Sequence, residues 1–308
     1  MSKIIQISSL MFMLMLSLAV SAQEIVLAFT DTLGRATSLD GTARSKMLIR
    51  NMARADVNQA MFLIKTKTVT NNTVERLAFY NETGQLLVNA GHHPSMVIRQ
   101  KSFGYPIDIM RANGILEPYE NYRKHVHFPY LYGNSDPAVL AQLQQFLAEH
   151  NYLPTYVTTR VHDDYMNQLY QARVLSGRSV DIRAIEKAYV SMVVKAVTRY
   201  DARAQMMLGF SPRQVLLLHE NDLAAYCIIG VIDELNKLGF KIISPEKVFT
   251  DPISNPYFKS GFSATGYMAY VTGLPEEKPI WYEIANQKDK EEIHGYLHEQ
   301  GLDSMYAQ

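Results

Sequence analysis

The sequence has very few of the residues that hold small secreted folds together by covalent bonds. In 308 residues it contains one cysteine, Cys227, and one tryptophan, Trp281. A single cysteine excludes an internal disulfide. Cys227 lies in the apolar run 224–232, a setting typical of a thiol that serves as a small buried hydrophobe. The fold must therefore depend on its hydrophobic core alone.

An excess of charge of either sign is also missing. Lys and Arg number 30 and so do Asp and Glu, which gives a formal net charge of zero. This balance predicts neither nucleic acid nor an anionic membrane as a partner. An apolar content of 47% is too high for a disordered chain, so the composition indicates an ordinary globular protein.

Only one long run lacks charge, and it lies at the start of the chain. Lys3 precedes a stretch rich in Leu, Met and Ile that extends to Val20, and small residues follow at positions 21 and 22. This pattern predicts a signal peptide over residues 1–22 and export to the periplasm or beyond. The alternative, a membrane anchor, is less consistent with the polar residues Gln6 and Ser8, and no later stretch is long and apolar enough to span a bilayer.

Several familiar active-site motifs are absent from the chain. The sequence has no G-x-S-x-G nucleophile elbow, no P-loop and no G-x-G-x-x-G dinucleotide fingerprint. The zinc motif H-E-x-x-H is absent as well, because Leu occupies position 223 after His219 and Glu220. These absences argue against serine hydrolases of the elbow type, P-loop enzymes and Rossmann dehydrogenases.

Strand-like and helix-like segments alternate along most of the chain. The predicted strands cover residues 24–29, 58–64, 85–89, 126–132, 156–159, 214–218 and 241–244, and helical patterns cover 38–55, 73–80, 102–112, 137–150, 164–203 and 223–238. Such alternation predicts an α/β fold with a parallel sheet, either a (β/α) barrel or a doubly wound sheet. After Asp251 the pattern ends in a Gly- and Pro-containing tail, interpreted as a cap over residues 253–308.

Histidine and acidic residues gather directly after the predicted strands. Six of the nine histidines lie there, and the full set is Asp31, His92, His93, His125, His127, His162, Asp163, Asp164 and the run His219 to Asp222. In parallel barrels the carboxyl ends of the strands carry the functional groups. His and carboxylate ligands at one end predict a divalent metal such as zinc, with one coordination position left for water.

Each of these residues also has a purely structural interpretation. Asp31 is equally suited to cap the segment that follows it, and His92 with His93 fits a solvated loop. Asp222 has the position of a helix N-cap before the run that starts at Leu223. The case for a site therefore rests on the grouping of these residues at one end of the sheet.

The residues at the strand ends resemble the motifs of the polysaccharide deacetylases, which are metal-dependent carbohydrate esterases that remove N-acetyl groups from chitin-like or peptidoglycan sugars. The similar segments are 25–31 (IVLAFTD), 84–94 (GQLLVNAGHHP), 126–130 (VHFPY), 157–163 (VTTRVHD) and 215–219 (VLLLH), in the family's order. The resemblance covers 25–252. It implies a distorted (β/α) barrel of seven or eight strands, over residues 23–252.

The resemblance also implies roles for individual residues. Asp31 matches the family's metal-binding aspartate and His93 its second metal histidine. His219 matches the general acid that protonates the leaving amine, and Asp163 the acidic residue that positions it. The wall of the substrate groove is matched by Pro129 and Tyr130.

Three positions depart from the family pattern. Thr30 stands where the catalytic base belongs, Ala90 where the first metal histidine belongs, and His127 where an arginine belongs. Threonine does not ionise at working pH, and two protein ligands hold zinc weakly. Two extra histidines offer a rescue, in which His92 takes the empty ligand position and His127 acts as the base.

Two functions follow from these patterns. The first is an exported, zinc-dependent deacetylase of N-acetylated amino-sugar polymers, with a metal-dependent amidase acting on a small amide as a weaker variant. The alternative is a catalytically inactive barrel of the same fold that binds glycan or a protein partner.

Overall fold

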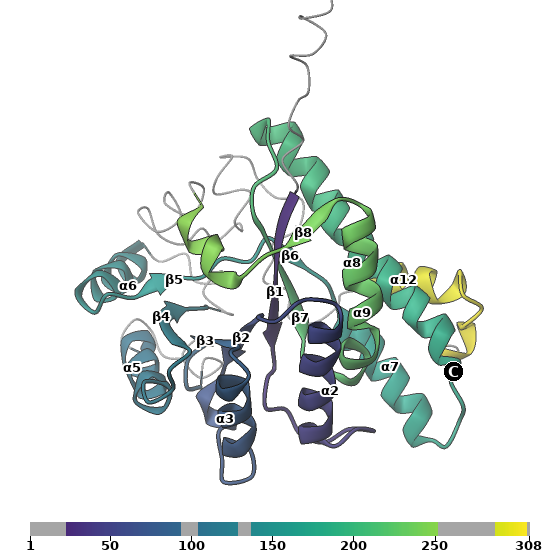
Figure 1. Ribbon diagram of the computed structural model, residues 1–308, viewed down its shortest axis with the longest axis horizontal. Helices are drawn as coiled ribbons and strands as arrows, with labels where there is room; N and C mark the ends of the chain where they lie inside the picture. Colours follow the sequence, from purple (N-terminus) through teal and green to yellow (C-terminus); the bar gives the residue numbers. More distant parts are fainter. Residues whose placement is uncertain (1–22, 94–103, 129–136, 252–286, 307–308) are drawn as a thin grey trace, which may run out of the picture.

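A curled parallel β-sheet lies at the centre of the molecule (Figure 1). The computed structural model describes residues 23–93, 104–128, 137–251 and 287–306. Its eight described strands are β1 (Gln23–Thr30), β2 (Met61–Ile64), β3 (Leu86–Asn89), β4 (Tyr122–Val126), β5 (Leu153–Pro154), β6 (Thr159–Arg160), β7 (Gln214–His219) and β8 (Phe240–Ile242). Seven of them follow the order β5-β4-β3-β2-β1-β7-β6. The predicted α/β fold, a distorted (β/α) barrel of seven or eight strands, is thus confirmed, with the sheet curled into a half-barrel.

Strand β1 organises the sheet because three strands pair with it. β7 runs along one edge for six residues, from Ile25 opposite Gln214 to Thr30 opposite His219. The other edge is shared, with β8 pairing over the first residues of β1 and β2 pairing near its end. All three pairings are parallel, so the carboxyl ends of β1, β2 and β7 meet at one rim.

Both faces of β1 are buried, which explains its continuous apolar sequence. Ile25, Leu27 and Phe29 belong to the core between the sheet and the helices. Val26 and Ala28 belong to a second core inside the curl of the sheet. Successive side chains of a strand point to opposite faces, so a strand covered on both sides has apolar residues at every position.

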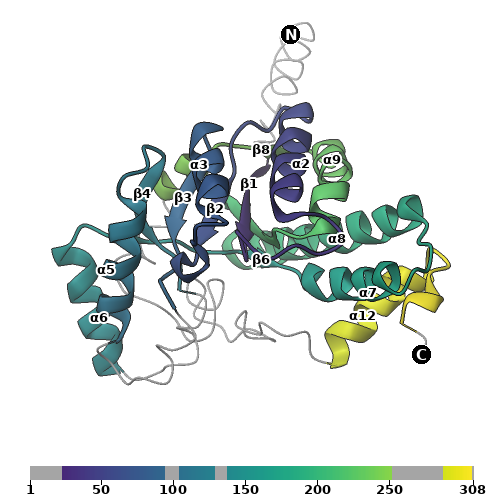
Figure 2. The same cartoon turned by 90° about the horizontal axis from the view of Figure 1, so that it is seen from below.

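Helices surround the convex side of the sheet (Figures 1 and 2). They are α2 (Gly41–Arg54), α3 (Val74–Glu82), α5 (Gly104–Leu116), α6 (Pro137–Glu149), α7 (Asp163–Leu175), α8 (Ile182–Leu208), α9 (Asp222–Lys237) and α12 (Gln287–His298), with short 3-10 turns η1 (Thr66–Thr68), η3 (Pro245–Thr250) and η4 (Asp303–Met305). The N-cap Asp40 accepts hydrogen bonds from the amides of Thr42 and Ala43, and α8 ends at Gly209, whose φ of 78° favours glycine.

Three sequence-based details differ from the structure. The predicted strand 156–159 is replaced by two short strands, β5 and β6, with residues 155–158 between them. The fourth strand covers Tyr122–Val126 where 126–132 was predicted, so His125 lies inside the strand. Residues 129–132 of the predicted strand lie outside the described residues. The cap of α9 is Asn221, whose side chain accepts a hydrogen bond from the Ala224 amide. Asp222 instead accepts hydrogen bonds from the residues at 37–39, which the linear sequence places far away.

The C-terminal helix α12 packs beside α7 and α8. Arg199 of α8 forms an ion pair with Glu292 at 2.6 Å, and Tyr165 of α7 contacts His294 at 2.9 Å. Residues 253–286 of the predicted cap lie outside the described residues, so the cap and the boundary at 252 stay predictions. Residues 1–22 of the predicted signal peptide also lie outside them.

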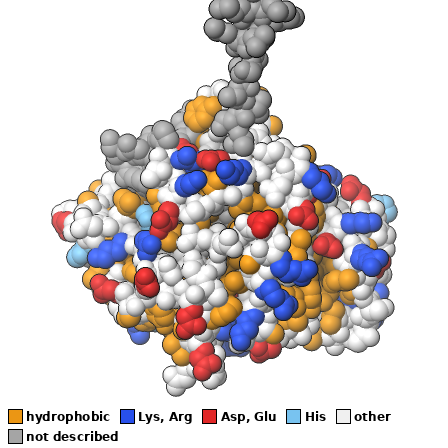
Figure 3. All heavy atoms as spheres, in the orientation of Figure 1, with side chains coloured by type: hydrophobic (Ala, Val, Ile, Leu, Met, Phe, Trp, Pro, Cys, Tyr) orange, Lys and Arg blue, Asp and Glu red, His pale blue; other side chains and the backbone are white. Residues whose placement is uncertain are grey.

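The surface carries both signs of charge. On the face shown in Figure 3, Lys and Arg side chains alternate with Asp and Glu over the described residues. Such mixing gives this face no strong field for steering a polyanion. Within the part of the chain that the structure describes, no helix has the length and apolarity to cross a membrane.

Candidate functional site

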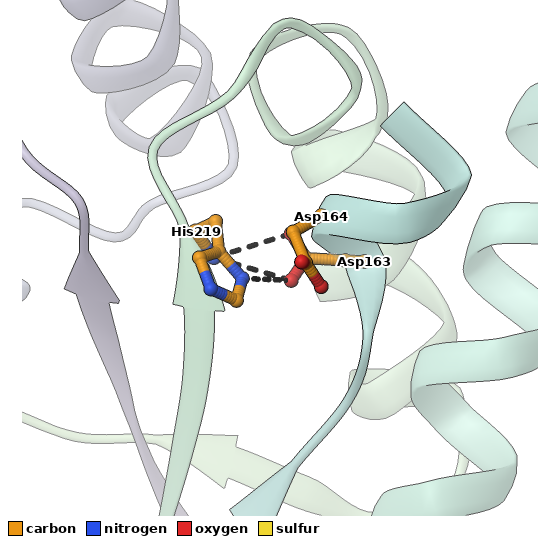
Figure 4. Close-up of side chains that lie close together, drawn as sticks. All are labelled: Asp163, Asp164 and His219. Carbon is orange, nitrogen blue, oxygen red and sulfur yellow. Dashed lines mark hydrogen bonds and ion pairs between the residues drawn. The ribbon is translucent and has the colours of Figure 1, made fainter. Parts of the chain in front are cut away.

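A buried aspartate and a histidine form the centre of the candidate site (Figure 4). His219 is the last residue of β7, and Asp163 is the first residue of α7. Their side chains meet with the histidine Nδ1 2.6 Å from the Asp163 Oδ1. Asp163 is completely buried and also accepts hydrogen bonds from the His219 amide, Asn221 Nδ2 and Tyr189 OH. Four donors therefore hold this carboxylate in a single orientation.

The charges around His219 favour its protonated form. Burial by itself would lower the pKa of His219, but the hydrogen-bonded carboxylate of Asp163, together with Asp164 and Asp31, raises the pKa above its ordinary value. Because Nδ1 is engaged with Asp163, the proton available for chemistry is on Nε2. That atom lies 4.0 Å from Asp31 Oδ2.

Asp31 follows β1 at the same rim and forms an ion pair with a lysine. The Nζ of Lys65, the residue directly after β2, lies 2.9 Å from Asp31 Oδ1. Partial burial would raise the pKa of Asp31, but the nearby charges of Lys65 and His219 lower it below its usual value. The φ of Asp31 is 50°, a left-handed conformation that aspartate tolerates better than most residues. These charges favour the ionised form of Asp31 and the protonated form of His219.

The loop with His92 and His93 is held close to the end of β2. Both backbone amides donate to the carboxylate of Asp108, at 2.9 and 2.7 Å. The side chains face the η1 turn, where His92 Nδ1 lies 3.0 Å from Thr66 Oγ1 and His93 Nε2 contacts Lys67 Nζ. Each predicted metal histidine therefore has a polar partner from the segment after β2.

A search for groups of metal ligands does not bring the predicted set together. Among the residues that the structure describes, the one group of three is Asp163, Asp164 and His219, whose ligand atoms all lie within 4.8 Å of one another (Figure 4). Asp31, His92 and His93 form no such group. The rim thus contains an Asp/His cluster that could hold a metal ion, but with a different membership from the predicted set.

The contacts of this cluster argue against a metal ion. Asp163 already accepts four hydrogen bonds, and the His219 Nδ1 is one of the donors. A cation at the centre would have to break that pair. Asp164 Oδ1 is buried without a hydrogen-bond partner in the described part of the chain, but one available oxygen is fewer than the three protein ligands usual at a catalytic zinc site. The residues fit an acid–carboxylate pair better than a zinc site.

His127 lies near the site but is deeply buried. Its side chain is next to the positive charges of Arg160 and Lys65, and its Nδ1 has no hydrogen-bond partner among the described residues. Burial, with those charges, lowers the pKa of His127 to about 3. His127 is buried, whereas the Asp31 side chain is 57% exposed at the rim and lies 4.0 Å from His219 Nε2, so the geometry favours Asp31 as the base.

Acid is expected to destabilise the protein in part through His127. Folded His127 stays neutral down to about pH 3, whereas in the unfolded chain it takes up a proton near the ordinary value of 6.5. Between these values the unfolded state binds more protons, so this group's contribution to the free energy of unfolding falls by about 1.4 kcal/mol per pH unit as the pH is lowered. Urea unfolding at about pH 7 and about pH 4.5 measures the change.

The matched variants for this measurement are His127→Phe and His298→Phe. His298 is exposed, with 73% of its side chain accessible, so its replacement is expected to leave the pH dependence unchanged. His127→Phe is expected to flatten it. The same change of the free energy of unfolding with pH in the wild-type protein and in His127→Phe would contradict the lowered pKa of His127.

The other predicted positions have structural roles or lie outside the described residues. Thr30 is buried at the end of β1, opposite His219. Ala90 is buried in the inner core, and its amide donates to the Ile64 carbonyl. Pro129 and Tyr130 lie outside the described residues, so their predicted place in the groove wall stays a prediction. His125 stacks on Phe249 with ring centroids 3.5 Å apart, and burial lowers its pKa to about 4.

Lys65 was not predicted from the sequence as a site residue. It follows the predicted strand 58–64 directly, the same positional signal that indicated Asp31 and His219. A lysine is not a metal ligand of the kind that the histidine and acidic residues at the strand ends suggested. Arg160 in β6 was missed for the same reason, although its positive charge acts on both Asp31 and His127.

Comparisons with solved structures identify the fold. The described arrangement is similar to the polysaccharide deacetylase Bc1974 from Bacillus cereus, with a TM-score of 0.50 and 13% identity over 72% of this chain and 91% of that chain. Another match is the peptidoglycan deacetylase PdaC from Bacillus subtilis, with a TM-score of 0.46 and 14% identity over 75% of this chain and 91% of that chain. A third is a mutant of BA3943, a pseudoenzyme of carbohydrate esterase family 4 with restored activity, with a TM-score of 0.49 and 10% identity over 74% of this chain and 68% of that chain.

Neither a protein-family model nor a curated protein matches the sequence. The structural likeness therefore concerns the backbone, and at these identities it defines the fold and no more. It agrees with the order of strand-end motifs in 25–31, 84–94 and 215–219. This chain has the fold of the polysaccharide deacetylases of carbohydrate esterase family 4.

Proposed function

We propose that this protein is a hydrolase of the deacetylase type, which removes N-acetyl groups from amino-sugar polymers. The observation that carries the proposal is the pairing of two groups in complementary charge states. His219 presents a protonated Nε2 and Asp31 an ionised carboxylate 4.0 Å away, both at the carboxyl edge of the sheet. A general acid and a general base so close together suit the hydrolysis of an amide.

The reaction follows from these two groups. Asp31 takes a proton from a water molecule, and the water oxygen forms a bond to the acetyl carbonyl carbon. The C–N bond then breaks as His219 Nε2 gives its proton to the leaving nitrogen. The products are acetate and the free amine of the sugar. Asp163 keeps the imidazole oriented throughout, because its Oδ1 accepts the proton on Nδ1 at 2.6 Å.

Zinc is the ion that the sequence indicates for such a reaction. Bound zinc would polarise the acetyl carbonyl and lower the pKa of a bound water. The predicted ligands Asp31, His92 and His93 are engaged with Lys65, Thr66 and Lys67, and the steps above assign nothing to a metal.

Export and domain organisation complete the proposal. The pattern of residues 1–22 supports a cleaved signal peptide, and an amino-sugar polymer of a cell wall is a substrate found outside the cytoplasm. The mature chain then consists of a barrel over 23–252 and a C-terminal cap over 253–308. The place of action is the periplasm or the extracellular space.

A second candidate is a catalytically inactive barrel that binds glycan or a protein partner. The substitutions at Thr30, Ala90 and His127 favour it, since the first two are buried in structural roles and the third is a weak base. Such a protein would keep the rim as a binding surface without turnover.

Release of acetate separates the two candidates. The wild-type protein is expected to release acetate from N-acetylated chito-oligosaccharides or peptidoglycan fragments, and to leave the same polymers without acetyl groups unchanged. Binding of the acetylated polymer with no acetate released over hours would reject the hydrolase and support the inactive barrel.

A further inference from the structure

Three residues after β2 contact all three of the predicted metal ligands. Lys65 Nζ forms an ion pair with Asp31, the Thr66 hydroxyl contacts His92 Nδ1, and Lys67 Nζ contacts His93 Nε2. We propose that Lys65 is the cation of this site, and that its ammonium group stands beside Asp31 in place of a divalent metal.

The contacts of Asp31 show why a metal and Lys65 exclude each other. One carboxylate oxygen lies 2.9 Å from Lys65 Nζ and the other 4.0 Å from His219 Nε2. Each oxygen therefore already has a cationic neighbour. A divalent ion on Asp31 would have to approach the ammonium group closely, and like charges at such distances repel strongly when the site is partly buried.

Lys65 is held in place by its backbone and its burial. Its side chain is only 21% exposed, although Asp31 is 57% exposed. Its carbonyl accepts a hydrogen bond from Thr68 Oγ1, and the next amide, of Thr66, donates to the Gly91 carbonyl. The segment after β2 is thus tied to the loop that carries His92. Nζ has a defined position at the rim, which a solvated lysine would lack.

The same segment also faces the second predicted ligand. Lys67 Nζ contacts His93 Nε2, a ring nitrogen that could otherwise bind a metal. The amide of Lys67 donates to the His92 carbonyl at 3.0 Å, so the turn and the histidine loop form one unit. Two lysines and a threonine therefore each engage one possible ligand atom of the three predicted ligands.

The role of Lys65 in turnover rests on the proposed function. The ammonium would donate a hydrogen bond to the acetyl oxygen and stabilise the negative charge that develops there as water attacks. It forms no covalent bond and keeps its proton, so the products and the proton balance stay as described above. Hydrolysis would then proceed without a metal at Asp31.

Zinc calorimetry on the full chain, after dialysis against a chelator, tests the proposal without any activity. The wild-type protein is expected to have no zinc site that depends on Asp31, so Asp31→Asn changes no zinc affinity. Lys65→Gln is expected to create such a site and to bind zinc at least about tenfold more tightly than the wild-type protein, because the variant lacks the positive charge that repels the ion. The double variant Lys65→Gln/Asp31→Asn is expected to lose it again.

Lys241→Gln is the matched control. Lys241 lies in β8, opposite Glu24 at the start of β1. Its replacement removes one positive charge beside the start of β1, at the end of that strand away from Asp31. It is expected to behave as the wild-type protein. One zinc bound by the wild-type protein, with affinity at least about tenfold weaker in Asp31→Asn, would overturn the proposal. That measurement requires no Lys65 variant to fold.

The assay of acetate release then separates this inference from the function it rests on. Turnover that persists in chelator supports Lys65 as the cation. Turnover that is lost in chelator and restored by zinc overturns it, and leaves the hydrolase standing. A protein that releases no acetate under any condition refutes the hydrolase, and the calorimetry still decides which cation occupies Asp31.

Discussion

Replacing His219 by asparagine is expected to lower kcat/KM for deacetylation by about a hundred- to ten-thousand-fold, the usual effect of losing a general acid. The imidazole Nε2 lies 4.0 Å from Asp31 Oδ2, and asparagine has no atom at that position. Its amide nitrogen is placed near the lost Nδ1 and can still donate to Asp163. The variant therefore removes the acid and keeps the buried hydrogen bond.

The control is the same substitution at an exposed His–Asp pair. His298 lies 2.7 Å from Asp303 with 73% of its side chain exposed, far along α12 from the rim. His298→Asn is expected to leave kcat/KM unchanged. Acetate release is measured at several substrate concentrations, with thermal unfolding of both variants to confirm that they fold. A loss of less than about tenfold in His219→Asn would rule out His219 as the acid.

Replacing Glu220 by glutamine is expected to lower the free energy of unfolding by about 3–5 kcal/mol, because it leaves a buried cation without its partner. Glu220 is completely buried directly after His219. Its carboxylate accepts hydrogen bonds from Arg76 at 3.1 Å, Tyr80 at 2.6 Å, Ser45 at 2.5 Å and the Leu33 amide at 3.2 Å. Glutamine keeps the shape but loses the charge and one acceptor oxygen.

Urea unfolding of Glu220→Gln measures this loss, with Glu246→Gln as the control. Glu246 pairs with Arg123 at 2.9 Å, but both side chains are 40% or more exposed, so its loss is expected to cost about 1 kcal/mol or less. A similar small change in both variants would show that the buried network contributes little. Because the Leu33 amide binds Glu220, the variant is also expected to loosen the turn that carries Asp31.

The sequence alone predicted a parallel sheet and most of its strands along the chain. Buried strands such as 25–29 and 214–218 are continuous apolar runs, and the helices between them have apolar faces, so local patterns were enough. The sequence also singled out His219 and Asp163 as residues after strands that resemble family motifs, and the structure brings their side chains together. Local signals failed for the fourth strand, which was predicted over 126–132 with Pro129 inside it, whereas it covers Tyr122–Val126.

Only the tertiary structure decided which charges meet at the rim. Lys65 and Asp31 are 34 residues apart, Glu220 and Arg76 are 144 apart, and their pairing depends on which strands are neighbours in the sheet. The different surroundings of His125, stacked on Phe249, and His127, beside Arg160 and Lys65, are likewise absent from the linear pattern. Sequence patterns reflect local periodicity, whereas the charges and pKa values of a site depend on contacts between residues that are far apart in the sequence.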